Sequence, residues 1–104
     1  MAIVDVTIIP IGTEGPSVSK YVATIQTVLE QFKQEGVIEY QLTPINTIIE
    51  GELSQLLKVI QAIHEVPFKH GIQRVATNIR IDDRRDKKST MVSKMESVQK
   101  HLTD

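Results

Sequence analysis

A small set of hydrogen-bonding side chains stands out in this sequence, because most of them lie beside a predicted turn or helix start. Thr47 and Glu50 are polar residues in an otherwise apolar segment, and Gly51 directly follows the carboxylate. A carboxylate flanked by hydroxyl groups can accept hydrogen bonds from an amino-heterocycle or face an organic cation. The same candidate ligand-binding set includes two serines at a predicted helix start, an amide on the last predicted strand and an arginine just after it: Ser17, Ser19, Asn78 and Arg84.

Each of these residues also has an ordinary structural explanation. Serines at a helix start commonly cap the first backbone N–H groups. Glu50 can favour the N-terminal end of the helix that follows it, and Thr47 is a common type of strand residue. Arg84 lies in the charged segment 82–88, where ion pairs within a solvated loop are usual. The residues alone favour the solvated loop for Arg84 and leave the ligand site and the structural role equally open for the others.

No convincing catalytic or metal-binding constellation accompanies this set. The three histidines (His64, His70 and His101) lack the spacing of zinc ligands. His64 falls toward the end of a predicted helix, which favours a structural role. Zero cysteines exclude disulfides and thiolate chemistry. We therefore expect no enzyme, no cofactor and no metal site, and Glu50 is the one general-base candidate if the chain is a cryptic enzyme.

Length and charge narrow the class of protein. A chain of 104 residues suits one domain, covering residues 1–104. A net charge of -1 and a pI near 6.3 give no electrostatic reason to expect a nucleic acid or an anionic membrane as partner. Segment 74–80 also lacks the aromatic residues that RNA-binding strands use for base stacking. No apolar stretch approaches the ~20 residues of a membrane span, so we expect a cytoplasmic protein.

Residue alternation predicts four strands. Residues 2–11 and 74–82 alternate between two faces as strands do. Residues 39–42 and 45–50 form two shorter predicted strands around Pro44, which cannot donate to a sheet ladder and therefore belongs at a turn or an edge.

Apolar residues at helical spacing predict three helices. The first runs from Ser17 to about Glu35 and the second from Glu52 to about Val66, where Pro67 stops it. The third is predicted to begin after Ser89 as its N-cap. The order β-α-β-β-α-β plus one helix predicts an α+β ferredoxin-like sandwich: a four-stranded antiparallel sheet with two helices on one face, plus an extra C-terminal helix.

The sheet face that the two helices leave open is predicted to mix apolar and polar side chains. A wholly solvated face would be more polar, and a core face would be less so. The mixture favours a homo-oligomer that packs sheet on sheet, and the alternative is a monomer with a partly solvated sheet. The residues predicted on this face are Ile3, Thr7, Ile9, Ala76, Asn78 and Arg80.

The sequence resembles the small thiamine-binding, YkoF-like proteins over nearly the whole chain, from Val4 to about Val98. Two runs carry most of the resemblance: Ile-Ile-Glu-Gly-Glu at 48–52 and Gly-Ile-Gln-Arg-Val at 71–75. The other matching residues are Pro10, Gly12, Ser17, Ser19, Val22, Leu42, Pro44, Thr47, His64, Thr77, Asp83 and Arg84.

This resemblance implies a ferredoxin-like fold, dimers that associate into tetramers, and binding of thiamine or its hydroxymethylpyrimidine half, with no established enzymatic activity. It also implies that Thr47 and Glu50, with Ser17 or Ser19, contact the ligand. We therefore predict a cytoplasmic, homo-oligomeric binding protein for thiamine or a related pyrimidine. The alternative is a structural or regulatory interaction module without a small-molecule ligand.

Overall fold

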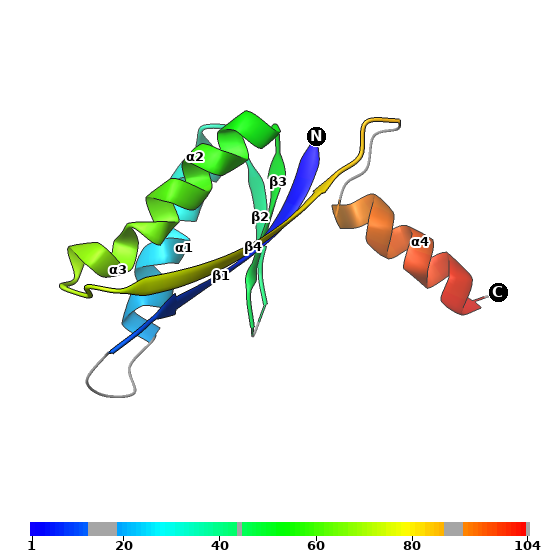
Figure 1. The fold of residues 1–104 in the computed structure, drawn as a ribbon. Coiled ribbons are helices and arrows are strands. Elements are labelled where there is room, and N and C mark those ends of the chain that lie inside the picture. The colour runs from blue at the N-terminus through cyan, green and yellow to red at the C-terminus, as the bar shows by residue number, and fades with distance from the viewer. Residues whose placement is uncertain (13–18, 44, 87–90, 104) are drawn as a thin grey trace.

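A computed structural model describes residues 1–12, 19–43, 45–86 and 91–103 of the chain (Figure 1). It contains four strands and four helices in these ranges. In chain order they are β1 (Ala2–Pro10), α1 (Ser19–Gln34), β2 (Glu39–Leu42), β3 (Thr47–Gly51), α2 (Leu53–His64), α3 (Val66–Lys69), β4 (Val75–Asp83) and α4 (Met91–Thr103).

The four strands form one sheet in the order β2-β3-β1-β4, and every neighbouring pair is antiparallel. Helices α1 and α2 cover one face of the sheet, and α4 lies on the other side (Figure 1). This arrangement confirms the predicted ferredoxin-like α+β sandwich with an extra C-terminal helix. It also puts β4 at one edge of the sheet, directly beside β1.

The core lies between the sheet and the two covering helices. Alternation along β1 sends Val4 and Val6 to the helix face, where both are buried. Their partner across the β1–β3 pair, Ile49, is fully buried too. The remaining buried apolar side chains come mainly from one stripe on each helix: Ile25, Leu29, Leu56, Val59, Ile60 and Ile63.

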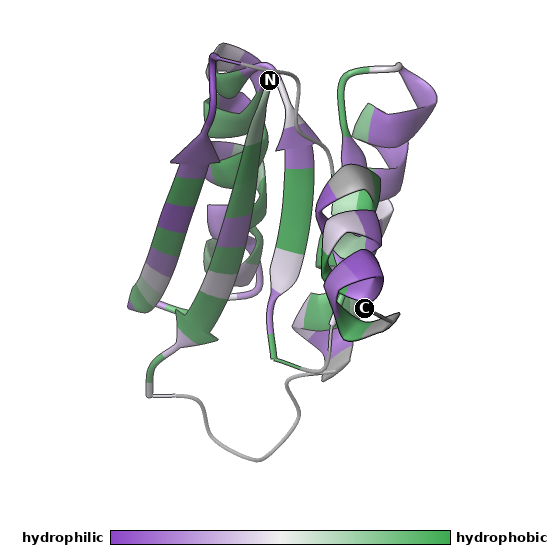
Figure 2. Ribbon diagram, turned by 90° about the vertical axis from the view of Figure 1, so that its right-hand side faces the viewer, coloured by the Kyte–Doolittle hydropathy of each residue, from purple (hydrophilic) through white to green (hydrophobic). Residues whose placement is uncertain are grey.

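The other face of the sheet is open, as the alternation predicts (Figure 2). Cross-strand partners point to the same side of a sheet, so Thr7 shares this face with Asn78, and Asp5 shares it with Arg80. Helix α4 stands in front of part of this face, over the β2 side, while β1 and β4 remain uncovered (Figure 2).

Gly51 is required by a close approach of two chain segments. A Cβ atom at this position would lie 3.0 Å from the carbonyl oxygen of Val37 and 3.4 Å from Leu56 Cδ2. The φ angle of Gly51 is not positive, so this glycine is not needed for a left-handed backbone conformation. Gly51 therefore lets β3 and α2 pack against the turn before β2.

Pro67 behaves differently from the prediction. Helix α2 ends at His64, and residues Val66–Lys69 form the separate short helix α3. Proline is tolerated in the first turn of a helix, where its missing N–H would have no intrahelical partner. Pro67 therefore lies at the start of a new helical turn.

Helix α4 has an apolar stripe with little of its surface covered. The exposed fractions are 65% for Val92, 65% for Met95, 51% for Val98 and 74% for Leu102. The sequence predicts the helical spacing of this stripe, but it does not predict which surface the stripe faces.

Candidate functional site

Glu50 lies near the end of β3 on the open face of the sheet. It pairs with Ile3 of β1 and with Glu39 of β2, and Ile3 pairs in turn with Asp82 of β4. Three carboxylates and one isoleucine therefore form a row across the whole sheet. Only 8% of Glu50 is exposed, and among the described residues it is the one buried charged side chain.

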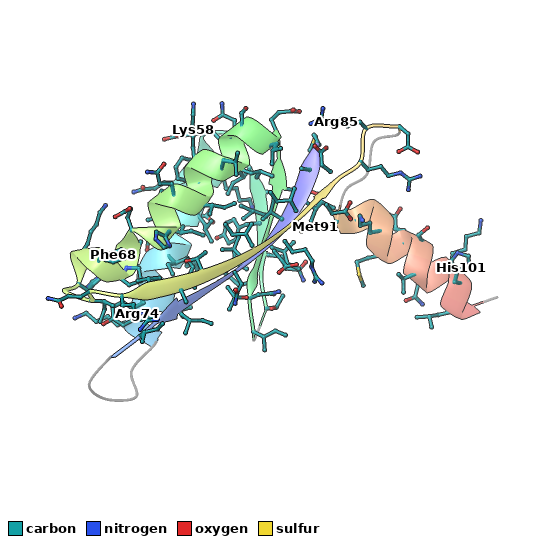
Figure 3. The ribbon with its side chains drawn as sticks, viewed as in Figure 1. Lys58, Phe68, Arg74, Arg85, Met91 and His101 are labelled. Carbon is teal, nitrogen blue, oxygen red and sulfur yellow. The ribbon has the colours of Figure 1, made fainter. Side chains whose placement is uncertain are left out.

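The carboxylate of Glu50 binds the start of helix α4. Its Oε2 atom accepts a hydrogen bond from the backbone N–H of Met91 at 2.9 Å, and Met91 is the first residue of α4. The side chain therefore satisfies a donor that has no partner within its own helix, at the positive end of the helix dipole. Figure 3 shows Met91 at the end of α4 nearest the sheet.

Glu50 does not cap the helix that directly follows it. The N-cap of α2 is Glu52, whose side chain makes no capping hydrogen bond. The structural alternative predicted from the sequence, in which Glu50 favours the start of the second helix, therefore applies to a helix 41 residues further along the chain.

A hollow lies beside Glu50, partly on the open face and partly around the β4 edge, and Glu50 itself is not among its lining residues. Its apolar lining includes Ile3 and Ile48, which are the nearest same-face neighbours of Glu50 on β1 and β3. Its polar lining is mostly acidic: Asp5, Asp82 and Asp83, with the single cation Arg80.

Basic side chains hold the acids of this hollow in place. Arg80 Nε donates to Asp5 Oδ2 at 2.7 Å, and Lys94 of α4 pairs with Asp82. The Arg85 guanidinium donates to Asp83 at 2.8 Å, and this hydrogen bond lowers the pKa of the Asp83 carboxyl below its ordinary value. An apolar floor with a carboxylate rim is suited to a flat organic cation.

Thr47 does not share this surface with Glu50. Side chains three positions apart on a strand point to opposite faces, and Thr47 pairs with Val6, whose side chain enters the core. Thr47 is half-buried on the helix side of the sheet. The structure therefore corrects the predicted pairing of this hydroxyl with the carboxylate within one subunit.

Asn78 lies on the open face, and Arg84 directly follows Asp83, which lines the hollow. Asn78 is on the open face opposite Thr7, which is four residues from Ile3 along β1, or about 13 Å. Arg84 follows β4 and makes two hydrogen bonds to Asp86, at 2.6 and 3.0 Å, which raise the pKa of its guanidinium. This is an ion pair within a charged loop, which is the structural alternative predicted for Arg84.

The two helix starts lie at opposite ends of the sheet. Helix α1 begins at Ser19 after the C-terminal end of β1, whereas Glu50 pairs with Ile3 at the other end of that strand. A strand of this length separates the two by about 25 Å, so one ligand in one subunit does not bridge them. Ser17 lies outside the described residues.

A second polar and aromatic cluster lies at the end of the sheet where α1 begins. His64 Nδ1 and Thr77 Oγ1 are 2.6 Å apart, linking the end of α2 to β4. The ring of Phe68 lies 5.5 Å from that of His64, and the rings of Tyr21 and His70 meet edge-on at 5.3 Å. The predicted structural role of His64 agrees with this packing.

Residues missed by the sequence reasoning are those that only the sheet register brings to Glu50. Ile3, Ile48 and Asp82 come from three different strands, and Met91 comes from a helix whose position no local pattern indicates. Within the described ranges, no group of three or more histidine, aspartate or glutamate side chains is placed to hold a metal ion. No helix in those ranges is long and apolar enough to cross a membrane.

The comparisons with known proteins agree on one family. A family model described as thiamine-binding protein matches residues 4–99. The UPF0045 protein YqgV of Bacillus subtilis is 72% identical over 102 residues, which are 98% of this chain and 98% of YqgV. A UPF0045 protein of Methanothermobacter thermautotrophicus is 34% identical over 103 residues, covering 98% of this chain and 100% of its own length.

Solved structures share the fold. The hypothetical protein MJ1052 of Methanocaldococcus jannaschii superposes with a TM-score of 0.80 at 30% identity, covering 94% of this chain and 95% of its own. The protein TM0486 of Thermotoga maritima has a TM-score of 0.73 at 15% identity, covering 93% and 97%, and shows the fold alone. These matches are to a thiamine-binding and UPF0045 family and to no known enzyme family. The resemblance seen in the sequence is therefore confirmed, and the chain belongs to the thiamine-binding protein family.

Proposed function

We propose that this chain is a cytoplasmic, non-catalytic binding protein for thiamine or its hydroxymethylpyrimidine half, and that Glu50 anchors the ligand. The observation that carries the proposal is a nearly buried carboxylate beside an apolar and acidic hollow on the open face of the sheet. The family description supports a binding role. The TM0486 protein, which shares the fold, is described as a candidate thiamine biosynthesis or salvage protein.

The chemistry of the ligand suits this surface. Thiamine combines an aminopyrimidine, which offers N–H donors, with a positively charged thiazolium ring. The Glu50 carboxylate would accept hydrogen bonds from the amine, and the rim acids would balance the positive charge by exchanging their present basic partners Arg80, Lys94 and Arg85. The flat faces of both rings would cover the side chains of Ile3 and Ile48.

The other predicted contacts differ in how they could take part. Asn78 shares the open face with Glu50 and would contact the far end of an extended ligand. Arg84 directly follows Asp83 of the hollow and would reach a ligand by exchanging its Asp86 partner. Ser17, Ser19 and Thr47 would contribute to the same ligand from a neighbouring subunit.

Self-association forms part of the proposal. The open face carries exposed Ile9, and α4 presents its uncovered apolar stripe. Such surfaces are typical of interfaces between subunits, which supports a dimer or tetramer. The same stripe favours the second candidate function, a structural or regulatory interaction module that binds a protein and no small molecule.

Isothermal titration with thiamine and with hydroxymethylpyrimidine tests the main proposal. The native chain is compared with Glu50→Gln, which keeps the shape of the side chain and removes its charge. Glu52→Gln is the matched control, because it makes the same change on an exposed side chain two residues away. We expect Glu50→Gln to weaken binding about tenfold or more, and Glu52→Gln to bind as the native chain does. Absence of heat with either ligand at millimolar concentration would overturn the proposal.

A further inference from the structure

The Glu50 carboxylate binds the start of α4 in the structure and binds the ligand in the proposed function. In the structure its Oε2 atom is the acceptor for the first backbone N–H of α4, at 2.9 Å. In the proposed function the same charge would bind the donors and the positive charge of a ligand. The two partners are chemically alike, because a helix start presents N–H donors and a partial positive charge.

In the described part of the chain, the contacts between α4 and the rest of the subunit are mostly polar. Met91 is bound to Glu50, and Lys94 is paired with Asp82. The side of the helix near β2 borders a shallow groove with Tyr40 and Gln41. The helix leads away from this contact, so that His101 lies far from the sheet (Figure 3).

Burial of the apolar stripe contributes little to the packing of α4 against the sheet, since half or more of the surface of each stripe residue is exposed. A helix of 13 residues is also marginal without tertiary contacts, because isolated helices shorter than about 12–15 residues are barely stable in water. In the described part of the chain, the first turn of α4 is therefore stabilised by the Glu50 hydrogen bond, the Lys94–Asp82 pair and the partly buried side chain of Met91.

A ligand can reach the Glu50 carboxylate only if the groups that now cover this side chain move. With only 8% of the residue exposed, a ligand cannot surround the carboxylate while every present contact remains. A cation bound there would also repel the positive end of the helix dipole at close range. Ligand and helix start therefore oppose each other in both space and charge.

We propose that the start of α4 is an autoinhibitory strap that competes with the ligand for the Glu50 carboxylate, so that ligand binding releases the first turn of α4. This inference rests on the proposed function, because it takes the thiamine-like ligand as the competitor. It goes further by assigning α4 a regulatory role at that site. A ligand that only filled the hollow beside an intact Glu50–Met91 hydrogen bond would have no such effect.

Substitution of the donor tests the competition directly. Met91→Pro removes the N–H that binds Glu50, and proline is well suited to the first position of a helix. Met91→Ala is the matched variant, because it shortens the side chain and keeps the N–H. We expect Met91→Pro to bind thiamine or hydroxymethylpyrimidine at least fivefold more tightly than Met91→Ala by isothermal titration.

Hydrogen exchange measured by mass spectrometry on the full chain supplies a second readout. We expect amides of residues 91–103 to exchange at least fivefold faster in Met91→Pro than in Met91→Ala without ligand, and faster in the native chain when thiamine is saturating. Glu50→Gln should speed this exchange without ligand, and Glu52→Gln should not. These comparisons do not depend on one variant folding well.

The outcomes separate the strap from the proposed function. Ligand binding with equal affinity in Met91→Pro and Met91→Ala would overturn the competition and leave the binding function standing. Slower exchange of α4 on ligand binding would also overturn it, because the helix would then be part of the bound state. No binding by the native chain or either variant would overturn both.

Discussion

The Oε2 atom of Glu50 and the backbone nitrogen of Met91 lie 2.9 Å apart, although 41 residues separate them in the sequence. This hydrogen bond joins the end of β3 to the start of the extra helix. It places α4 on the open face of the sheet, away from the layer formed by α1 and α2 (Figure 1). The most buried charge in the described part of the chain therefore belongs to the surface where a ligand is expected.

Neighbouring residues on β3 should respond very differently to truncation. Ile49 is fully buried against the helices, so Ile49→Ala should lower the free energy of unfolding by about 2–5 kcal/mol through lost burial and a cavity. Ile48 lines the hollow on the opposite face, so Ile48→Ala should cost about 1 kcal/mol or less and should weaken thiamine binding. Urea unfolding and isothermal titration measure the two effects, and equal destabilisation by both substitutions would contradict the face assignment.

The strand faces and the topology were predictable because they rest on short-range patterns. Alternation along β1 and β4 and the helical stripes fix which side of each element enters the core. The same alternation also implies that Thr47 and Glu50, three apart on one strand, point to opposite faces. The sequence reasoning grouped them by proximity along the chain and by family resemblance, and so placed them together.

Other features of the candidate site depend on contacts that no local pattern encodes. Antiparallel pairing of β1 with β3 puts Glu50 at the end of the sheet remote from Ser19. The position of Met91 depends on where an amphipathic helix docks, and its stripe gives only the direction of its apolar side. A polar residue inside an apolar strand was therefore enough to select Glu50, but not to identify its partner.

Replacement of Gly51 and replacement of Gly36 should lower stability for different reasons. Gly51→Ala should cost about 1–3 kcal/mol, because its Cβ would lie 3.0 Å from the Val37 carbonyl oxygen. Gly36 has a φ of +75° with nothing within 4 Å of the added Cβ, so Gly36→Ala should cost about 1–2 kcal/mol through the backbone alone. Asparagine tolerates positive φ, so Gly36→Asn should be more stable than Gly36→Ala, while Gly51→Asn should be no better than Gly51→Ala. Denaturation midpoints of the four variants measure this, and recovery by asparagine at Gly51 would contradict the steric explanation.

The contact between Tyr40 and Glu30 should make stability depend on pH. Tyr40 donates to Glu30 Oε2 at 2.6 Å, and this hydrogen bond is the main cause that lowers the pKa of Glu30 from its ordinary value of 4.5. Because the folded-state pKa is the lower one, the stabilisation is complete above about pH 4.5 and is lost as the pH falls through the lowered pKa. Tyr40→Phe should therefore destabilise the chain at pH 7, and the difference from the native chain should shrink in acid.

Urea unfolding of native chain and Tyr40→Phe across this pH range measures the effect, with Tyr21→Phe as the control tyrosine. The same bond raises the pKa of Tyr40 above 10.0, so the stabilisation should also be lost as the pH rises through that raised value. A stability difference that stays constant from neutral pH into acid would show that ionised Glu30 is not the acceptor.

The apolar stripe of α4 should determine the oligomeric state. A glutamate at Met95 or Val98 would place a charge in the surface that we propose to be covered by another subunit, and burying it there would be costly. We expect the native chain to have a mass of two or four times 11.7 kDa by light scattering, and Met95→Glu or Val98→Glu to shift it toward a single chain. Ser97→Glu changes an exposed position off the stripe and should keep the native mass. A native mass of one chain would contradict the proposed self-association, and multimers that persist in both glutamate variants would assign the interface to the open sheet alone.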